Sequence, residues 1–200
     1  MIGITGGIAT GKSTVSARLR QLGAKVLDAD CIAKAVVEPH TPGWKKVKKA
    51  FPDVVRSDST IDRQKLGTLI FSDTQSRRIL EEIIHPEVIA ELKRLGRYYE
   101  ERGYTVFCDI PLLYETGCDA WLDEVWVVYT DPATQLARLM RRDGIEADEA
   151  KKRIQAQMPL TEKIRRADRL INNSDSLSLT RQQVDTLWEE WKRENRPNRT

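Results

Sequence analysis

The sequence predicts an α/β fold, with a central parallel sheet of about five strands flanked by helices. A first short strand contains Ile2 and Ile4 and runs directly into a glycine cluster. A helix over 12–22 follows, because its apolar residues recur at helical spacing, and a second strand is expected over 24–28. Strand, helix and strand in this order form a βαβ unit, which requires a parallel strand pair.

Later segments supply the rest of the sheet. Residues 106–110 and 125–129 are β-branched or aromatic runs bounded by Gly, Pro and Asp, as buried parallel strands usually are. Residues 169–171 are expected to form a fifth strand. The pattern Thr180-x-x-Gln183 resembles a capping box and predicts the start of the C-terminal helix there.

Two insertions interrupt this core. The first, over about 37–102, is rich in charge and in helical patterns, such as the helix predicted to start at Pro86. The second, over about 142–166, is polar and contains two short helices separated by Met158-Pro159, which suits a mobile lid. The chain is thus expected to be a single domain over 1–200, with its core at about 1–36, 103–141 and 167–194.

Composition excludes several classes of protein. The 200 residues fit one domain, and 33 Lys and Arg against 30 Asp and Glu leave a net charge of +3, too small for a default nucleic-acid partner. The apolar runs are too short to span a membrane, and the start lacks a signal-peptide pattern, so we expect a cytoplasmic protein without a membrane or obligatory protein partner. Cys31, Cys108 and Cys118 form no C-x-x-C pair, which argues for reduced thiols and against structural zinc.

The clearest motif is a phosphate-binding loop. Gly6-Gly7-Ile8-Ala9-Thr10-Gly11-Lys12-Ser13 matches G-x-x-x-x-G-K-[ST] at every fixed position, between a strand and a helix as the motif requires. Its backbone N–H groups would surround phosphate oxygens, Lys12 would reach the β and γ phosphates, and the Ser13 hydroxyl would bind Mg²⁺. The sequence therefore predicts binding of a nucleoside triphosphate together with Mg²⁺; the choice of ATP as co-substrate follows only from the family resemblance given below.

The remaining sequence separates the classes of P-loop protein. The [NT]-K-x-D motif of a GTPase is missing. A helical insertion and an Arg-containing lid instead suit a small-molecule kinase, in which the lid excludes water from the transferring phosphoryl group.

Acidic residues at the predicted strand ends are candidates for catalysis. Asp28 and Asp30 follow the second strand, where open parallel sheets bind their ligands, and Asp30 is the first candidate for the base that accepts the acceptor's proton. Asp30 could alternatively cap a helix over 31–37, which would leave Asp28 as the base. Asp109 ends the third strand and could hold Mg²⁺ or cap the turn at Pro111.

Basic residues complete the candidate site. Arg138 and Arg142 lie four residues apart on a helix started by Asp131-Pro132, so both could neutralise transferring phosphate from one face, or simply be solvated. His85 is either a ligand-binding or a structural histidine.

In the order and spacing of its motifs, the chain resembles the dephospho-coenzyme A kinase family. The resemblance runs from Ile2 to about Leu187 and rests on the motifs Ile4-Thr5-Gly6-Gly7-Ile8, Gly11-Lys12-Ser13-Thr14, Asp28-Ala29-Asp30, Ile84-His85-Pro86, Asp109-Ile110-Pro111-Leu112-Leu113-Tyr114-Glu115, Gln135-Leu136, Arg142-Asp143, Gln157-Met158 and Ile171-Asn172-Asn173. It implies a P-loop kinase fold and ATP-dependent phosphorylation of the ribose 3′-hydroxyl of dephospho-CoA, the last step of coenzyme A biosynthesis. One departure is Glu146, where the family often has a Ser or Thr helix cap.

The resemblance also implies roles for residues at matching positions. Asp30, Lys12, Arg138 and Thr5 would be catalytic. ATP would contact Gly6, Gly7, Ile8, Ala9, Thr10, Gly11, Lys12, Ser13, Thr14, Arg142 and Asn173, with Asn173 near the adenine. The acceptor would contact Asp30, His85, Pro111, Leu112, Leu113 and Glu115. The alternatives are a P-loop kinase for another nucleotide or alcohol, and an ATP-binding regulator without transfer activity.

Overall fold

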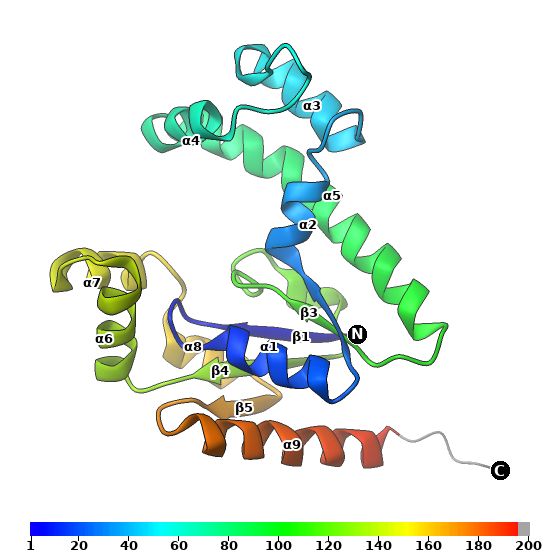
Figure 1. Ribbon diagram of the computed structural model, residues 1–200, viewed down its shortest axis with the longest axis vertical. Helices are drawn as coiled ribbons and strands as arrows, with labels where there is room; N and C mark the ends of the chain where they lie inside the picture. Colours follow the sequence, from blue (N-terminus) through cyan, green and yellow to red (C-terminus); the bar gives the residue numbers. More distant parts are fainter. Residues whose placement is uncertain (196–200) are drawn as a thin grey trace. The chain divides into compact units, whose positions relative to one another are not determined.

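A computed structural model of the chain describes residues 1–195 and contains the predicted five-stranded sheet (Figure 1). Its strands are β1 (Ile2–Gly6), β2 (Lys25–Asp28), β3 (Val106–Asp109), β4 (Glu124–Tyr129) and β5 (Arg169–Asn172). The strand order is β2-β3-β1-β4-β5, and β1 pairs in parallel with both β3 and β4. The α/β prediction and all five strand positions are therefore confirmed.

The chain divides into two compact units. The first, here called the sheet unit, comprises Met1–Val26 and the chain from Tyr99 onward, and the second, the helical unit, comprises Leu27–Tyr98. The sheet unit contains α1 (Lys12–Gln21), α6 (Pro132–Asp143), α7 (Ala147–Gln155), α8 (Leu160–Arg166) and α9 (Leu177–Glu194). The helical unit contains α2 (Ala29–Ala35), α3 (Pro42–Ala50), α4 (Arg63–Ser72) and most of α5 (Thr74–Glu100).

The helical unit has a hydrophobic core of its own. Trp44 and Val47 of α3 pack with Phe51, Leu66 and Leu80, all buried. The Trp44 indole also donates a hydrogen bond of 2.7 Å to the carbonyl of Ser59, which satisfies its polar N–H inside this core. The unit therefore folds around apolar side chains from three of its helices.

Helix α5 differs from the prediction at Pro86. We expected a helix to begin there, but α5 runs from Thr74 to Glu100 with Pro86 inside it. Proline lacks only one N–H donor, and this long helix has apolar residues to bury on both sides of Pro86.

The main core of the sheet unit lies between the sheet and two helices. Val15 and Leu19 of α1 and Val184 and Trp188 of α9 pack on one face of the strands. The strand residues of this face are Ile2, Ile4, Phe107, Trp126, Val128 and Ile171. Figure 1 shows α1 and α9 running beside the strands. Because α1 is fixed by this core, the loop that precedes it has a rigid support.

Helix α9 begins earlier than predicted. Its N-cap is Ser176, whose hydroxyl accepts a hydrogen bond from the N–H of Leu179, so the capping box at Thr180 was wrong. Thr180 is buried within the helix, and the Gln183 amide bonds to both backbone groups of Asn172. Both side chains therefore connect α9 to the end of β5.

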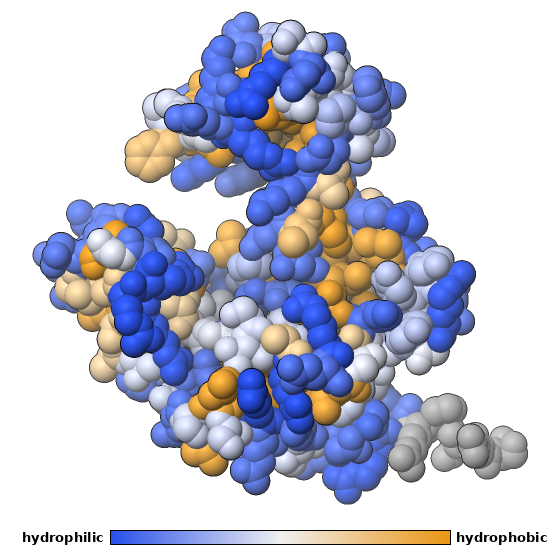
Figure 2. All heavy atoms as spheres, in the orientation of Figure 1, coloured by the Kyte–Doolittle hydropathy of each residue, from blue (hydrophilic) through white to orange (hydrophobic). Residues whose placement is uncertain are grey.

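The surface is consistent with the composition. Among residues 1–195, no helix is both long enough and apolar enough to cross a membrane. On the face shown in Figure 2, hydrophilic residues predominate and apolar residues lie in scattered groups.

We predict that Leu19→Ala destabilises the protein by about 2–5 kcal/mol, because Leu19 is fully buried between α1 and the sheet. Urea unfolding followed by circular dichroism measures this change. The matched control is Leu170→Ala on β5, where the side chain is 40% exposed; its cost should stay below about 1 kcal/mol. Equal losses for the two variants would contradict the assignment of the core.

Candidate active site

The phosphate-binding loop joins β1 to α1. Gly11 occupies the N-cap of α1 with φ of 87°, and Ala9 also has a positive φ, of 60°. A Cβ on Gly11 would overlap the side-chain nitrogen of Asn173, and one on Gly6 would lie 2.5 Å from the carbonyl of Val128. Glycine is therefore required at both positions, by backbone conformation at Gly11 and by close packing at both.

Side chains distant in sequence hold the carbonyl groups of this loop. Gln135 of α6 donates a hydrogen bond of 2.8 Å to the carbonyl of Ile8, and Asn173 donates one of 2.7 Å to the carbonyl of Thr10. The Thr10 hydroxyl donates to the carbonyl of Gly7. Gln157, after α7, accepts a hydrogen bond from the N–H of Ile8. The loop is thus fixed before any ligand binds.

Asn173 acts as a support of the loop in this structure. It is buried, and its side-chain oxygen accepts from the Thr180 hydroxyl at 2.7 Å while its nitrogen donates to Thr10. Its backbone carbonyl accepts from Nη1 of Arg138 at 2.7 Å. Both polar groups of the Asn173 side chain are therefore hydrogen-bonded to the protein.

Lys12 pairs with a buried carboxylate. Its ammonium contacts Oδ1 of Asp109, and Ser16 of α1 donates a hydrogen bond of 2.6 Å to Oδ2. Strand register causes this pairing, since Asp109 lies beside Ile4 where β1 and β3 approach their carboxyl ends. Neither observed partner belongs to the turn at Pro111, so Asp109 is not its cap. The pair places a cation and a carboxylate together beside the loop.

The two arginines of α6 have different surroundings. The helix begins as predicted, with Asp131 as N-cap, and the hydrogen bond from Thr134 lowers the pKa of Asp131. Arg138 is half-buried and directed to Asn173, whereas Arg142 is exposed and donates to Asp143. The hydrogen bond from Arg142 also lowers the pKa of Asp143. Nε and Nη2 of Arg142 are therefore both occupied by the carboxylate of Asp143.

The turn after β3 is anchored to β1 and to α8. The Thr5 hydroxyl donates a hydrogen bond of 3.0 Å to the carbonyl of Pro111. Leu113 is fully buried, whereas Leu112 is 41% exposed and Glu115 is partly exposed. Burial raises the pKa of Tyr114 to about 12, so its hydroxyl stays protonated and donates to the carbonyl of Arg166. Of the predicted acceptor contacts here, Leu112 has the most accessible side chain.

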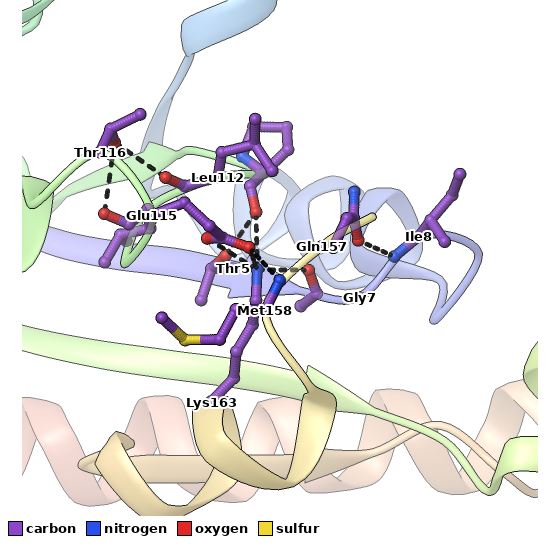
Figure 3. Close-up of polar contacts among 12 residues, drawn as sticks. Thr5, Gly7, Ile8, Leu112, Glu115, Thr116, Gln157, Met158 and Lys163 are labelled. Atoms are coloured by element: carbon purple, nitrogen blue, oxygen red, sulfur yellow. Dashed lines mark hydrogen bonds and ion pairs between the residues drawn. The ribbon is translucent and has the colours of Figure 1, made fainter. Parts of the chain in front are cut away.

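Four residues at this site were given no role in the sequence analysis. Gln135, Gln157, Ser16 and Lys163 contact the loop, Asp109 or the turn after β3. Gln135 and Gln157 stand within quoted motifs, but only the structure shows what they contact. Lys163 extends from α8 toward Glu115 (Figure 3). It lies in a run of charged residues and is nevertheless fully buried. Nothing in its sequence context distinguishes it from a solvated lysine.

The predicted residues of the helical unit lie on α2 and α5. Asp28 is the N-cap of α2 and accepts a hydrogen bond of 2.9 Å from the N–H of Cys31. Asp30 is exposed in the first turn, so the alternative in which Asp30 caps a helix that starts at Cys31 is wrong. His85 is exposed on α5. Asp30 is therefore left free of the capping role that Asp28 performs.

Residues 142–166, for which the sequence analysis expects a lid, contain the two predicted helices, α7 and α8. Glu146 occupies the N-cap of α7 without a side-chain cap, and α7 still begins at Ala147. The departure from the expected Ser or Thr thus removes a capping bond but not the helix.

The described residues suit a magnesium ion that arrives with the nucleotide. Residues 1–195 contain no cluster of three His, Cys, Asp or Glu side chains that could hold a metal by themselves. Mg²⁺ usually keeps several waters and binds substrate phosphates with one or two protein oxygens. The exposed Ser13 hydroxyl and the Asp109 carboxylate near Lys12 are donors of that kind.

Comparisons with known proteins give a consistent result. A family model described as dephospho-CoA kinase matches residues 1–178. The dephospho-CoA kinase of Symbiobacterium thermophilum is 52% identical over 190 residues, covering 94% of this chain and 80% of that protein. The enzyme of that name from Shouchella clausii is 49% identical, covering 92% and 94%. The solved structure of dephospho-CoA kinase from Campylobacter jejuni is similar with a TM-score of 0.77 at 30% identity, covering 97% and 98%.

We predict that Asn173→Asp weakens ATP binding by about 10- to 100-fold, because the new carboxylate loses the N–H donor and faces the carbonyl of Thr10. Isothermal titration with ATP and Mg²⁺ measures the Kd. Asn172→Asp is the matched control, since Oδ1 of Asn172 only accepts a hydrogen bond, from the N–H of Ser174, and aspartate keeps that acceptor. Unchanged affinity in folded Asn173→Asp would contradict the supporting role.

Proposed function

The chain belongs to the dephospho-CoA kinase family, and from this premise we propose how its residues divide the work of the reaction. The enzyme transfers the γ-phosphoryl group of ATP to the ribose 3′-hydroxyl of dephospho-CoA, giving coenzyme A and ADP as the last step of coenzyme A biosynthesis. The observation that carries the proposal is the rigid phosphate-binding loop with Lys12 at its end. Such a loop binds the donor, and the roles below follow from what surrounds it.

The loop binds the triphosphate through backbone N–H groups at the N-terminus of α1. Lys12 exchanges its contact with Asp109 for the β and γ phosphates, and Thr5 and Arg138 lie on the elements that border the transferring group. Arg142 contributes charge after releasing Asp143. Phosphoryl transfer depends on position and charge more than on covalent chemistry, which suits this set of side chains.

The Ser13 hydroxyl and the Asp109 carboxylate would hold the Mg²⁺ that accompanies ATP. The ion would supply positive charge against the phosphates of the donor. When Lys12 turns to phosphate, Asp109 keeps its hydrogen bond from Ser16 and regains a free oxygen toward the site.

Asp30 is the base that orients the ribose hydroxyl and takes its proton. Its carboxylate is exposed, while the carboxylate of Asp28 is used in capping α2. A general base needs an accessible oxygen within hydrogen-bonding reach of the proton it removes. The capping bond of Asp28 thus favours Asp30 over its neighbour.

Following the family resemblance, we assign contacts with the acceptor to His85 and to the turn Pro111–Glu115. Exposed Leu112 offers an apolar contact, and the Pro111 carbonyl is fixed by Thr5. Residues 142–166 form the lid that excludes water, since hydrolysis competes with transfer.

No nucleic acid, membrane or obligatory protein partner enters the reaction. Three free cysteines agree with a reducing compartment such as the cytoplasm.

We predict that purified protein with ATP and Mg²⁺ releases ADP when dephospho-CoA is added and not with AMP, CMP or adenosine. The mass of the product should exceed that of dephospho-CoA by one phosphoryl group. Chelation of Mg²⁺ should abolish transfer. Coupled ADP detection and mass spectrometry measure these outcomes. Transfer to another acceptor would replace the substrate assignment, and ATP binding without any transfer would favour a regulator.

We predict that Asp30→Asn lowers kcat by about 10²- to 10⁴-fold with the fold intact, because the amide cannot accept the hydroxyl proton. Steady-state kinetics and circular dichroism test this. Asp28→Asn is the control, since asparagine is also a good N-cap and should leave kcat within about threefold of wild type. A reversed pattern would assign the base to Asp28.

A further inference from the structure

The buried ammonium of Lys163 has a complete set of partners. It lies 2.9 Å from Oε1 of Glu115 and donates to the carbonyls of Pro111 at 3.2 Å and Gly6 at 3.5 Å (Figure 3). Its side chain is 0% exposed. A lysine has three donors and no acceptor, so all its N–H groups face acceptors.

Stability alone gives a weak reason for this arrangement. Removing an ammonium and a carboxylate from water carries a desolvation penalty that their attraction often does not exceed, and an apolar pair of similar size is frequently as stable. The ammonium of Lys163 is nevertheless buried, whereas the other basic residues of α8, Arg165 and Arg166, form ion pairs at the surface. The role of Lys163 is therefore to be sought in the segments that its contacts connect.

The partners of Lys163 belong to two segments, one of which binds the donor and the other the acceptor in the proposed function. Gly6 ends β1 and begins the phosphate-binding loop, whereas Pro111 and Glu115 begin and end the turn after β3. Glu115 also accepts a hydrogen bond of 3.0 Å from the N–H of Met158, just before α8. The lid segment thereby contacts the loop and the turn through one buried charge.

We propose that Lys163 is a positioning residue that fixes the turn Pro111–Glu115 relative to the phosphate-binding loop. The inference rests on the proposed function, in which the loop binds the donor and the turn contacts the acceptor. Without Lys163, donor and acceptor would still bind, but their reacting atoms would be misplaced. The loop itself keeps its supports from Gln135 and Asn173.

The test is Lys163→Met, which keeps the length of the side chain and removes the charge. We expect kcat to fall about 10- to 100-fold, since small displacements of reacting groups carry penalties of that size, while the Kd of ATP changes less than about threefold. Steady-state kinetics with dephospho-CoA and isothermal titration with ATP measure the two quantities. Wild-type kcat in folded Lys163→Met overturns the proposal.

Arg169→Met is the matched control for a purely structural ion pair. Arg169 is mostly buried and pairs with Glu124 at the beginning of β4 and β5, away from their carboxyl ends. We expect it to lower Tm without changing kcat per folded molecule. If Lys163→Met also changed kcat only in proportion to its unfolded fraction, its role would be structural and the proposal would fail.

A second variant covers the case in which Lys163→Met leaves Glu115 unpaired and does not fold. Lys163→Met/Glu115→Gln removes both charges of the pair together, and we compare it with Glu115→Gln alone, which retains the buried ammonium. The double variant should have a kcat at least about tenfold lower than the single variant. Equal values overturn the proposal. Because wild-type transfer to dephospho-CoA is measured first, failure of the proposed function is recognised separately.

Discussion

A loop that binds phosphate with its N–H groups must have its carbonyl groups satisfied by the protein, and much of the sheet unit depends on this constraint. Carbonyls of Gly6, Gly7, Ile8 and Thr10 accept hydrogen bonds from Lys163, Thr10, Gln135 and Asn173. Unpaired buried carbonyls are costly, so these donors make one backbone conformation much more stable than its alternatives. The loop is then preorganised for an anion, and binding need not order it.

The sheet brings these donors to the loop. β1 lies between β3 and β4, and β5 follows β4, so the segments after β4 and β5 emerge on the same side as the loop after β1. Gln135 and Asn173 come from those segments. The strands and the loop were predictable, because hydrophobic patterning and the G-x-x-x-x-G-K-S spacing are local properties of the sequence. The donor roles of Gln135, Asn173 and Lys163 were not, since they depend on contacts between positions more than a hundred residues apart.

Local sequence patterns gave the wrong helix start where two nearby residues could each serve as the N-cap. Thr180 and Ser176 can both cap a helix, and tertiary contacts decided, because Thr180 is needed against Asn173. Asp28 and Asp30 presented the same ambiguity, and Asp28 became the cap. A capping bond contributes only about 1 kcal/mol. Packing of the following helix can exceed that amount, so sequence alone does not determine which residue caps and which remains free for chemistry.

The proposed roles of Lys12 and Arg142 require both side chains to exchange an ion pair for phosphate. Lys12 pairs with Asp109 and Arg142 with Asp143, so an anionic ligand at either cation would compete with a carboxylate already in place. That competition lowers affinity for single anions and favours a ligand with several phosphates. Lys163 differs, because its partners include two carbonyls with no net charge and it has no exposed surface through which phosphate could replace them. Under the proposed roles, Lys12 and Arg142 exchange partners when phosphate binds, whereas Lys163 keeps its partners and maintains geometry.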